Sequence, residues 1–263
     1  MMHAEGDVSA EPLGLAGMRW ENKSQRVREV FENAPHYLKG RQVDIRFRAE
    51  TVKEFAEHVS WQRLLDIGCG DGTISLQLLK DKSHLTLMDL SSNMTAIVKQ
   101  NIPPTLTTNV EVRNEDFLKA TFAAKPFDLI VSVGVMAHVN SPDEFLAKIR
   151  TLLPLGGSAI IEFTDCRHFT GRIERLTSNL KEIFRPGKFR TNRLSFSQVA
   201  HLFEKNNLKL VSTFRYAMIP IPGIQKVISP KLLYKIISMI FGRCRKNRNA
   251  YLGNEYICLL TAI

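Results

Sequence analysis

The stretch "LLDIGCGDGT" at residues 64–73 places three glycines on alternate positions directly after a short apolar run. Gly68, Gly70 and Gly72 let the backbone turn sharply and let a ligand lie against it where a Cβ atom would clash. The acidic Asp71 stands between the last two glycines. A strand followed by such a loop predicts a cofactor site, and the acidic residue bears on which cofactor the loop accepts.

Strand and helix patterns alternate through the centre of the chain. Short apolar runs rich in β-branched residues are typical of strands buried on both faces, and they occupy 63–67, 85–90, 110–112, 127–133 and 158–163. Helical patterns lie between them at 73–80, 92–101 and 142–153. This alternation predicts right-handed crossovers and a parallel sheet with helices on both faces.

The C-terminal region follows a different pattern. Residues 208–219 and 255–263 both resemble strands, with no regular helix-and-strand unit between them, so we expect an antiparallel pair at one edge of the sheet. The whole pattern predicts an α/β fold: a Rossmann-like, doubly wound, mostly parallel seven-stranded sheet with an antiparallel last strand.

Length and composition predict one globular domain with added segments. The chain has 263 residues, of which 44% are hydrophobic and 24% are charged, ordinary values for a globular protein. We expect a mobile N-terminal tail at 1–20 and a single domain at 21–263. Lid or substrate-binding elements are expected at about 21–45, 166–193 and 218–254.

The cysteine pattern and the apolar runs bear on the cellular compartment. The four cysteines include no Cys-x-x-Cys pair and have no histidine at metal-binding spacing, which predicts neither a disulfide framework nor a zinc site. The first residues lack the pattern of a signal peptide, and the longest apolar stretch, 232–241, is shorter than the roughly 20 residues that span a bilayer. We therefore expect no metal, no transmembrane helix and a cytoplasmic protein.

Basic residues give a formal net charge of +10 and gather in two segments. One segment covers 167–193, and the other covers 226–248 and contains no acidic residue. Basic patches attract phosphates in general. The clustering favours two local surfaces instead, and we expect no nucleic-acid partner.

Acidic residues around the glycine loop indicate the cofactor. Asp66 and Asp71 bracket the loop with negative charge, which opposes the pyrophosphate of a dinucleotide. Asp89 ends the second strand, where a carboxylate accepts hydrogen bonds from a ribose. Asp116 follows the third strand, where an acceptor meets an exocyclic amine and the Phe117 ring walls an aromatic base. A ribose, a base and a cationic centre together describe S-adenosylmethionine.

The chain resembles the class I S-adenosylmethionine-dependent methyltransferases over residues 45–165. "LLDIGCGDGT" resembles the family's glycine motif, "MDLS" its ribose-binding acidic position, and "NEDF" its adenine-contacting segment. "FDLIVSVGVMAHV" resembles the fourth strand beside the transferring methyl group, and "LLPLGGSAIIEF" the helix, turn and fifth strand that follow. Five motifs in the right order are more specific than one glycine loop.

The resemblance implies a set of cofactor-binding residues, with Cys69 taking part through its backbone. They are Arg48, Asp66, Gly68, Cys69, Gly70, Gly72, Asp89, Leu90, Met94, Asp116, Phe117 and Val133. Structural alternatives exist, because the glycines could form a plain turn, Asp89 could cap a helix, Asp116 could be an exposed turn residue and Phe117 could belong to the core. These alternatives do not explain why the features occur together.

Methyl transfer needs few catalytic residues, because displacement at a sulfonium depends on positioning the acceptor and excluding water. His138, just after the fourth strand, is the candidate general base, with a structural role in packing as the alternative. Relatives place an N-terminal tyrosine over the site and an arginine on the cofactor carboxylate. Tyr37 and Arg48 match these positions, and Arg46 fits the arginine equally well.

The resemblance also bears on the methyl acceptor. Methyltransferases of nucleic-acid bases or glutamine amides carry an Asn/Asp-Pro-Pro-aromatic stretch after the fourth strand, where this chain has "SVGV" at 132–135. The resemblance is to the small-molecule group that includes quinone, lipid and natural-product methyltransferases. We expect a small apolar acceptor, methylated at oxygen, nitrogen or carbon, with an anionic group that meets the basic residues of 167–193.

An apolar stripe at helical spacing lies within the second basic segment. It comprises Leu232, Leu233, Ile236, Ile237, Ile240 and Phe241. Such a helix lines an apolar substrate pocket, rests on an anionic membrane surface, or packs as an amphipathic lid on its own domain, and the lid is favoured over the membrane contact. Two other functions stay open: an RNA- or protein-directed methyltransferase, which the charge favours, and a non-catalytic cofactor-binding subunit.

Overall fold

Within the part of the chain that the structure describes, seven strands form one sheet in the order β3-β2-β1-β4-β5-β9-β6. The computed structural model describes residues 25–29, 31–32, 38, 41–122, 127–169, 192–218 and 228–263. The sheet strands are β1 (Arg63–Ile67), β2 (His84–Met88), β3 (Val110–Arg113), β4 (Leu129–Ser132), β5 (Ser158–Thr164), β6 (Leu208–Tyr216) and β9 (Glu255–Ala262). Strands β1 to β5 pair in parallel, and β9 runs antiparallel to both β5 and β6. The predicted fold class is confirmed.

Helices connect the strands and cover both faces of the sheet. They are α3 (Gln42–Ala56), η1 (Leu76–Leu78), α4 (Ser92–Asn101), η2 (Pro104–Asn109), α5 (Pro142–Leu152), α7 (Phe196–Lys205), α9 (Pro230–Phe241) and η3 (Ala250–Leu252). A short hairpin of β7 (Gly242–Arg243) and β8 (Lys246–Asn247) follows α9. None of the helices in the described ranges is long and apolar enough to cross a membrane.

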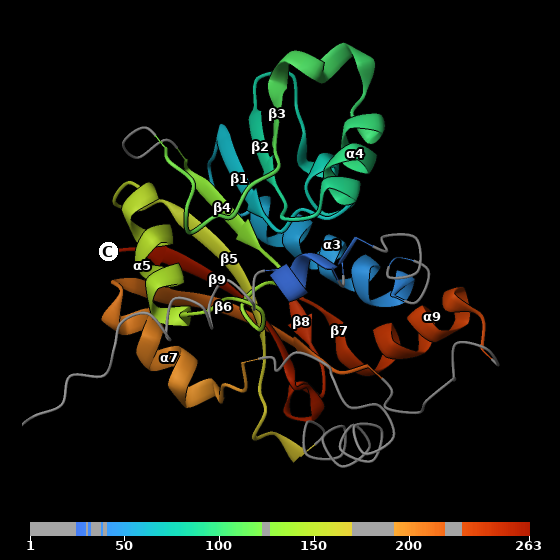
Figure 1. Ribbon diagram of the computed structural model, residues 1–263. Helices are drawn as coiled ribbons and strands as arrows, with labels where there is room; N and C mark the ends of the chain where they lie inside the picture. The colour runs from blue at the N-terminus through green and yellow to red at the C-terminus, as the bar shows by residue number, and fades with distance from the viewer. Residues whose placement is uncertain are drawn as a thin grey trace, which may run out of the picture.

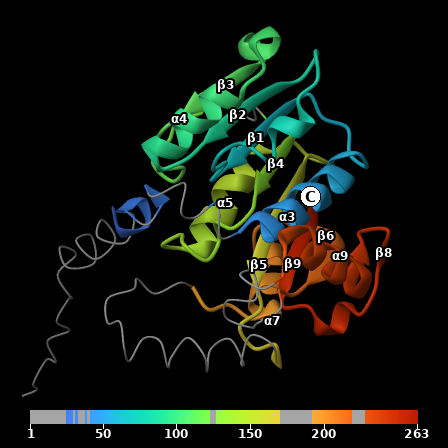
Figure 2. The ribbon, with the colours of Figure 1, turned by 90° about the vertical axis from the view of Figure 1, so that its right-hand side faces the viewer.

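The sheet separates two hydrophobic clusters. Helices α5 and α7 cover one face, while α3, α4 and α9 cover the other (Figure 1). The 90° view shows α3 and α9 side by side (Figure 2), and the two helices are in contact. The central strands are buried on both faces, as their continuous apolar runs predict: all four residues of β4 are buried.

Local capping explains where two predicted helices begin. The Ser91 hydroxyl accepts a hydrogen bond from Met94 N at 3.2 Å at the start of α4. The Ser141 hydroxyl accepts one from Glu144 N at 3.2 Å at the start of α5, where Pro142 takes the first helical position. The predicted helices at 92–101 and 142–153 therefore form with bounds within one residue of the expectation.

The helix predicted at 73–80 is the main correction to the fold. Only the 3-10 helix η1 forms there. Leu78 N donates to the Ser75 carbonyl at 2.9 Å, while the Gln77 side chain donates to the Ile74 carbonyl at 2.9 Å. The Gln77 side chain thus bonds the same carbonyl that Leu78 N would use in an α-helix, while Leu78 N makes the i to i−3 bond of a 3-10 helix.

Candidate cofactor and active site

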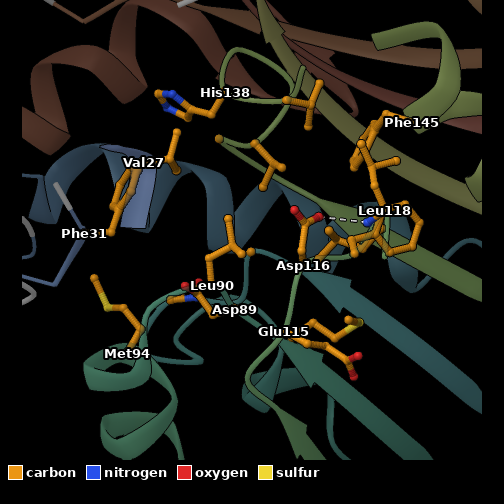
Figure 3. Close-up of a pocket in the computed structure, with 18 of the residues that line it drawn as sticks. Val27, Phe31, Asp89, Leu90, Met94, Glu115, Asp116, Leu118, His138 and Phe145 are labelled. Atoms are coloured by element: carbon orange, nitrogen blue, oxygen red, sulfur yellow. Dashed lines mark hydrogen bonds between the residues drawn. The ribbon is translucent and has the colours of Figure 1, made fainter. Parts of the chain in front are cut away.

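A cavity lies at the carboxyl ends of β1, β2, β3 and β4, the edge where parallel α/β sheets bind ligands (Figure 3). The sequence-predicted residues that line it are Gly68, Gly70, Asp89, Leu90, Met94, Asp116, Phe117, Val133 and His138. The structure therefore brings together residues from four strand ends that lie far apart in the sequence.

Gly68 sets the course of the glycine loop. Its N–H and that of Cys69 donate to the Met88 carbonyl at 2.8 and 2.9 Å, which ties the loop to the end of β2. The φ angle of Gly68 is +75°, and a Cβ atom there would lie 2.3 Å from Val135 Cγ2. Both conformation and space require glycine. Cys69 does not line the cavity, and burial raises the pKa of its thiol well above the usual range.

Asp89 joins the glycine loop to the start of α4. Its Oδ2 accepts a hydrogen bond from Gly70 N at 2.9 Å, and its Oδ1 accepts one from Ser91 N at 2.8 Å. Burial raises the pKa of Asp89, although these two backbone donors oppose the rise. Each carboxylate oxygen has a further lone pair. Asp89 is thus a fixed acceptor in the wall of the cavity, in a position suited to a diol.

Asp116 and Phe117 also line the cavity. Asp116 Oδ1 accepts a hydrogen bond from Leu118 N at 2.9 Å, drawn as the dashed line in Figure 3. Phe117 is 6% exposed, and its ring packs edge-on against Phe145 with centroids 5.3 Å apart. Phe117 therefore belongs to the core and lines the cavity as well, so the two interpretations given by the sequence are compatible.

Asp66, Asp71 and Gly72 lie near the loop without lining the cavity. The buried Asp66 Oδ2 accepts a hydrogen bond from Ser75 Oγ at 2.6 Å. Burial raises the pKa of Asp66 to about 7, a rise that Ser75 opposes and that the charge of Asp89 increases. Asp71 accepts from Thr73 N at 3.0 Å. Both carboxylates therefore accept hydrogen bonds from the chain itself.

The two candidate arginines also lie outside the cavity lining. Arg48 is 8% exposed, and its Nε donates to Glu162 Oε1 at 2.8 Å while its Nη1 lies 3.1 Å from Asp44 Oδ2. Arg46 bonds Glu50 at 2.9 Å. The arginine side chains are thus held by carboxylates of this chain. Tyr37 lies outside the described residues.

A short N-terminal segment forms part of the cavity wall, and the sequence did not single out its residues. Val27 and Phe31 line the cavity beside His138 (Figure 3). Glu32 holds the segment on α4, because its carboxylate accepts a hydrogen bond from Ser92 N at 3.1 Å. The signal available in the sequence was the i, i+4 spacing of Val27 and Phe31 within the expected lid at 21–45.

His138 sits in a turn that a distant residue holds. The ring of His138 lies edge-on to Phe31, with centroids 5.5 Å apart. The Asn192 side-chain amide donates to the carbonyls of Met136 and Val139 at 3.1 and 2.7 Å, one on each side of the histidine. Because Asn192 lies more than fifty residues further along the chain, no local pattern in the sequence could have indicated this contact.

The strand order, with a glycine loop after β1 and a carboxylate at the end of β2, defines the Rossmann-like fold of the S-adenosylmethionine-dependent methyltransferases. Residues 64–157 match the family model described as a methyltransferase domain. Residues 64–157 are therefore a methyltransferase domain, in agreement with the resemblance noted in the sequence.

Curated relatives are similar in sequence to part of this chain. It is 29% identical over 111 residues to phosphoethanolamine N-methyltransferase 2 of Caenorhabditis elegans, which covers 42% of this chain and 25% of the relative. It is 28% identical over 96 residues to a ubiquinone biosynthesis O-methyltransferase of Coxiella burnetii, covering 36% and 41%. The chain thus spans less than half the length of these two curated relatives.

A solved structure shows the same fold over most of the chain. Magnesium protoporphyrin IX methyltransferase of Synechocystis PCC 6803, crystallised with bound S-adenosylhomocysteine, superimposes with a TM-score of 0.62 at 14% identity. The superposition covers 92% of this chain and 100% of that chain. The likeness extends beyond the segment 64–157 into the antiparallel end of the sheet.

Proposed function

We propose that the protein is an S-adenosylmethionine-dependent methyltransferase that acts on a small, apolar acceptor. The observation that carries the proposal is a cavity lined by the backbone of the glycine loop and by the carboxylates of Asp89 and Asp116. Gly68, Gly70 and Val133 would hold the methionine end of the cofactor. Asp89 would bind the ribose, and Asp116 with Phe117 would bind the adenine.

The cofactor supplies a methyl group on a sulfonium, and the product is S-adenosylhomocysteine. The chain's own contribution is to position the acceptor and to exclude water. Val27 and Phe31 support this role, because they place apolar side chains over the cavity next to His138. The domain division, with lid elements at about 21–45, 166–193 and 218–254, is part of the same proposal.

The affinity for S-adenosylhomocysteine tests the cofactor site. We expect calorimetric titration to show tight binding to the wild-type protein and binding about tenfold to a hundredfold weaker to Asp89→Ala, because a charged acceptor is lost. Glu111→Ala is the matched control, since its exposed carboxylate on β3 does not line the cavity. Equal affinity in Asp89→Ala and the wild type would contradict the assignment.

The acceptor is proposed to be apolar because Val27, Phe31 and Val139 line the cavity near His138. Methylation at oxygen, nitrogen or carbon is compatible with this lining. An anionic group on the acceptor would meet the basic segment at 167–193, of which residues 170–191 lie outside the described residues. A screen of lipophilic phenols, amines and isoprenoids against polar metabolites tests the apolar acceptor.

Natural-product biosynthesis and a cytoplasmic or membrane-peripheral location are also part of the proposed function.

His138 is proposed as the general base for an acceptor that loses a proton. With an acceptor in hand, we expect His138→Gln to lower the turnover number about a hundredfold while leaving the affinity for S-adenosylhomocysteine unchanged. His84→Gln, at an exposed position that begins β2, is the control. Unchanged turnover in His138→Gln would assign the residue a structural role.

The two alternatives make different predictions. Methylation of RNA or protein, with no lipophilic acceptor modified, would favour a macromolecular substrate. Tight binding of S-adenosylhomocysteine with no acceptor in any class would favour a non-catalytic cofactor-binding subunit.

A further inference from the structure

Helix α9 has two apolar faces, and only one of them packs on the protein. Leu233, Ile237 and Phe241 are at most 4% exposed and belong to the core cluster shared with α3 and β6. These positions follow an i, i+4, i+8 spacing, which is one helix face. The helix thus packs on its own domain, as the favoured interpretation of the sequence expected, and none of its residues lines the cavity described above.

The second face of α9 points away from this core. We define it as the outer face: Leu232, Lys235, Ile236 and Met239, at i, i+3, i+4 and i+7. Leu232 is 50% exposed and Met239 is 61% exposed, Lys235 is exposed, and Ile236 is half-buried. The apolar stripe predicted from the sequence is therefore divided between the buried face and the outer face of α9. Leu232 and Ile236 lie on the outer face, together with Met239, which was not part of the predicted stripe.

The segment that contains this outer face is basic. Residues 230–254 contain no aspartate or glutamate. Lys231 on α9 is exposed, and so are Arg245, Lys246 and Arg248 in the hairpin region that follows. Arg243 is the exception, because it forms ion pairs with Glu50 and Glu54 of α3. The remaining basic side chains take part in none of the salt bridges found within the described residues.

We propose that the outer face of α9 docks on an anionic lipid bilayer. A row of aliphatic side chains with Lys231 and Lys235 along one edge suits the boundary between headgroups and acyl chains, where lysine places its charge among the headgroups. The basic hairpin region adds attraction to anionic lipids.

Two other occupants fit the outer face less well. A nucleic acid would leave Leu232 and Met239 in water, because phosphates offer no apolar partner. Protein interfaces are typically depleted in lysine and enriched in aromatic residues, whereas this face has a lysine and no aromatic side chain. The absence of acidic residues from 230–254 gives charge complementarity to an anionic surface.

Co-sedimentation with vesicles in the absence of cofactor tests the proposal independently of methyl transfer. We expect the full chain to bind vesicles of phosphatidylcholine mixed with phosphatidylglycerol, and to bind phosphatidylcholine alone much more weakly. Leu232→Ser/Met239→Ser should lower the partition coefficient at least about tenfold, because two apolar side chains leave the interface. Lys231→Gln/Lys235→Gln should lower it about fivefold for each lysine.

Leu155→Ser is the matched control, since Leu155 is 73% exposed in the turn between α5 and β5. It should bind as the wild type does, and all variants should retain the wild-type circular dichroism spectrum and melting temperature. The proposal is overturned if the wild type stays in the supernatant with mixed vesicles, or if Leu232→Ser/Met239→Ser binds them as the wild type does. Binding to RNA that only the lysine variant loses would assign the face to a nucleic acid instead.

Discussion

We expect Gly72→Ala to lower the free energy of unfolding by about 3 kcal/mol. The φ angle of Gly72 is +82°, a left-handed conformation that is unfavourable for alanine. A Cβ atom there would also lie 2.4 Å from Val98 Cγ2 and 2.8 Å from Leu76 Cδ1. The two costs add, because the overlap forces side chains on α4 and η1 to move. Urea denaturation followed by circular dichroism measures the change.

Gly156→Ala separates the two costs. Gly156 has a similar φ angle of +77°, but no atom lies within 4 Å of the position its Cβ would take. Alanine there should lower the free energy of unfolding by only about 1–2 kcal/mol, the cost of the conformation alone. If both variants lost the same amount, the close packing around Gly72 would not be the cause. The glycine that the sequence assigned to the cofactor would then need another explanation.

The fold could be predicted from the sequence because its signals are local. Each central strand is a continuous apolar run, since both of its faces are buried, and Ser91 and Ser141 mark helix starts that capping explains. The helix predicted at 73–80 was wrong because the contacts of this segment are not local. The Gln77 side chain in this segment bonds the Ala49 carbonyl of α3 at 2.7 Å, and such a contact with a distant helix has no local pattern in the sequence.

The candidate site could be predicted in part, for the same reason. Gly68, Asp89 and Asp116 stand at the ends of predicted strands, so topology alone brings them to one edge of the sheet. Two other features depend on contacts between segments that are distant in the sequence. Phe31 packs against His138, and Asn192 holds the turn that contains His138. Arg48 shows the limit most clearly, because its distance from the glycine loop suggested a cofactor contact while the fold gives it buried carboxylate partners.

Arg48 lies at the centre of a buried polar cluster between α3, β5 and β6. Besides its bonds to Asp44 and Glu162, Tyr216 Oη lies 2.6 Å from Asp44 Oδ1 and 3.2 Å from Glu162 Oε1. The cluster also adjoins the cavity wall, since a Cβ atom on Gly134 would lie 3.5 Å from Arg48 Nη1. Arg48 is thus the cation that compensates two buried carboxylates behind the cavity wall.

We therefore expect Arg48→Met to lower the free energy of unfolding by about 3–5 kcal/mol at pH 7.5, because Asp44 and Glu162 lose their counter-charge. Burial already raises the pKa of Glu162, although the charge of Arg48 opposes that rise, so removing the arginine should raise it further. Because the pKa of Glu162 is higher in the folded than in the unfolded protein, the stability that its protonation contributes is fully present below the pKa of the unfolded state. That stability is lost as the pH increases through the pKa of the folded state. The loss in Arg48→Met relative to the wild type should thus be smaller at pH 5 than at pH 8.

The double variant Arg48→Met/Glu162→Gln distinguishes an uncompensated charge from lost packing. If the unpaired carboxylate is the cause, replacing Glu162 with a neutral isostere should restore at least half of the lost stability and flatten its dependence on pH. The wild type must be measured at each pH as well. Desolvation and the charge of Glu162 raise the pKa of Glu255 to about 8, so the free energy of unfolding of the wild type also falls as the pH rises toward that value. A loss in Arg48→Met below about 1 kcal/mol, equal at pH 5 and pH 8, would show that the arginine does not compensate the cluster. Its nearness to Gly134 would then favour the direct contact with the cofactor carboxylate that the sequence suggested.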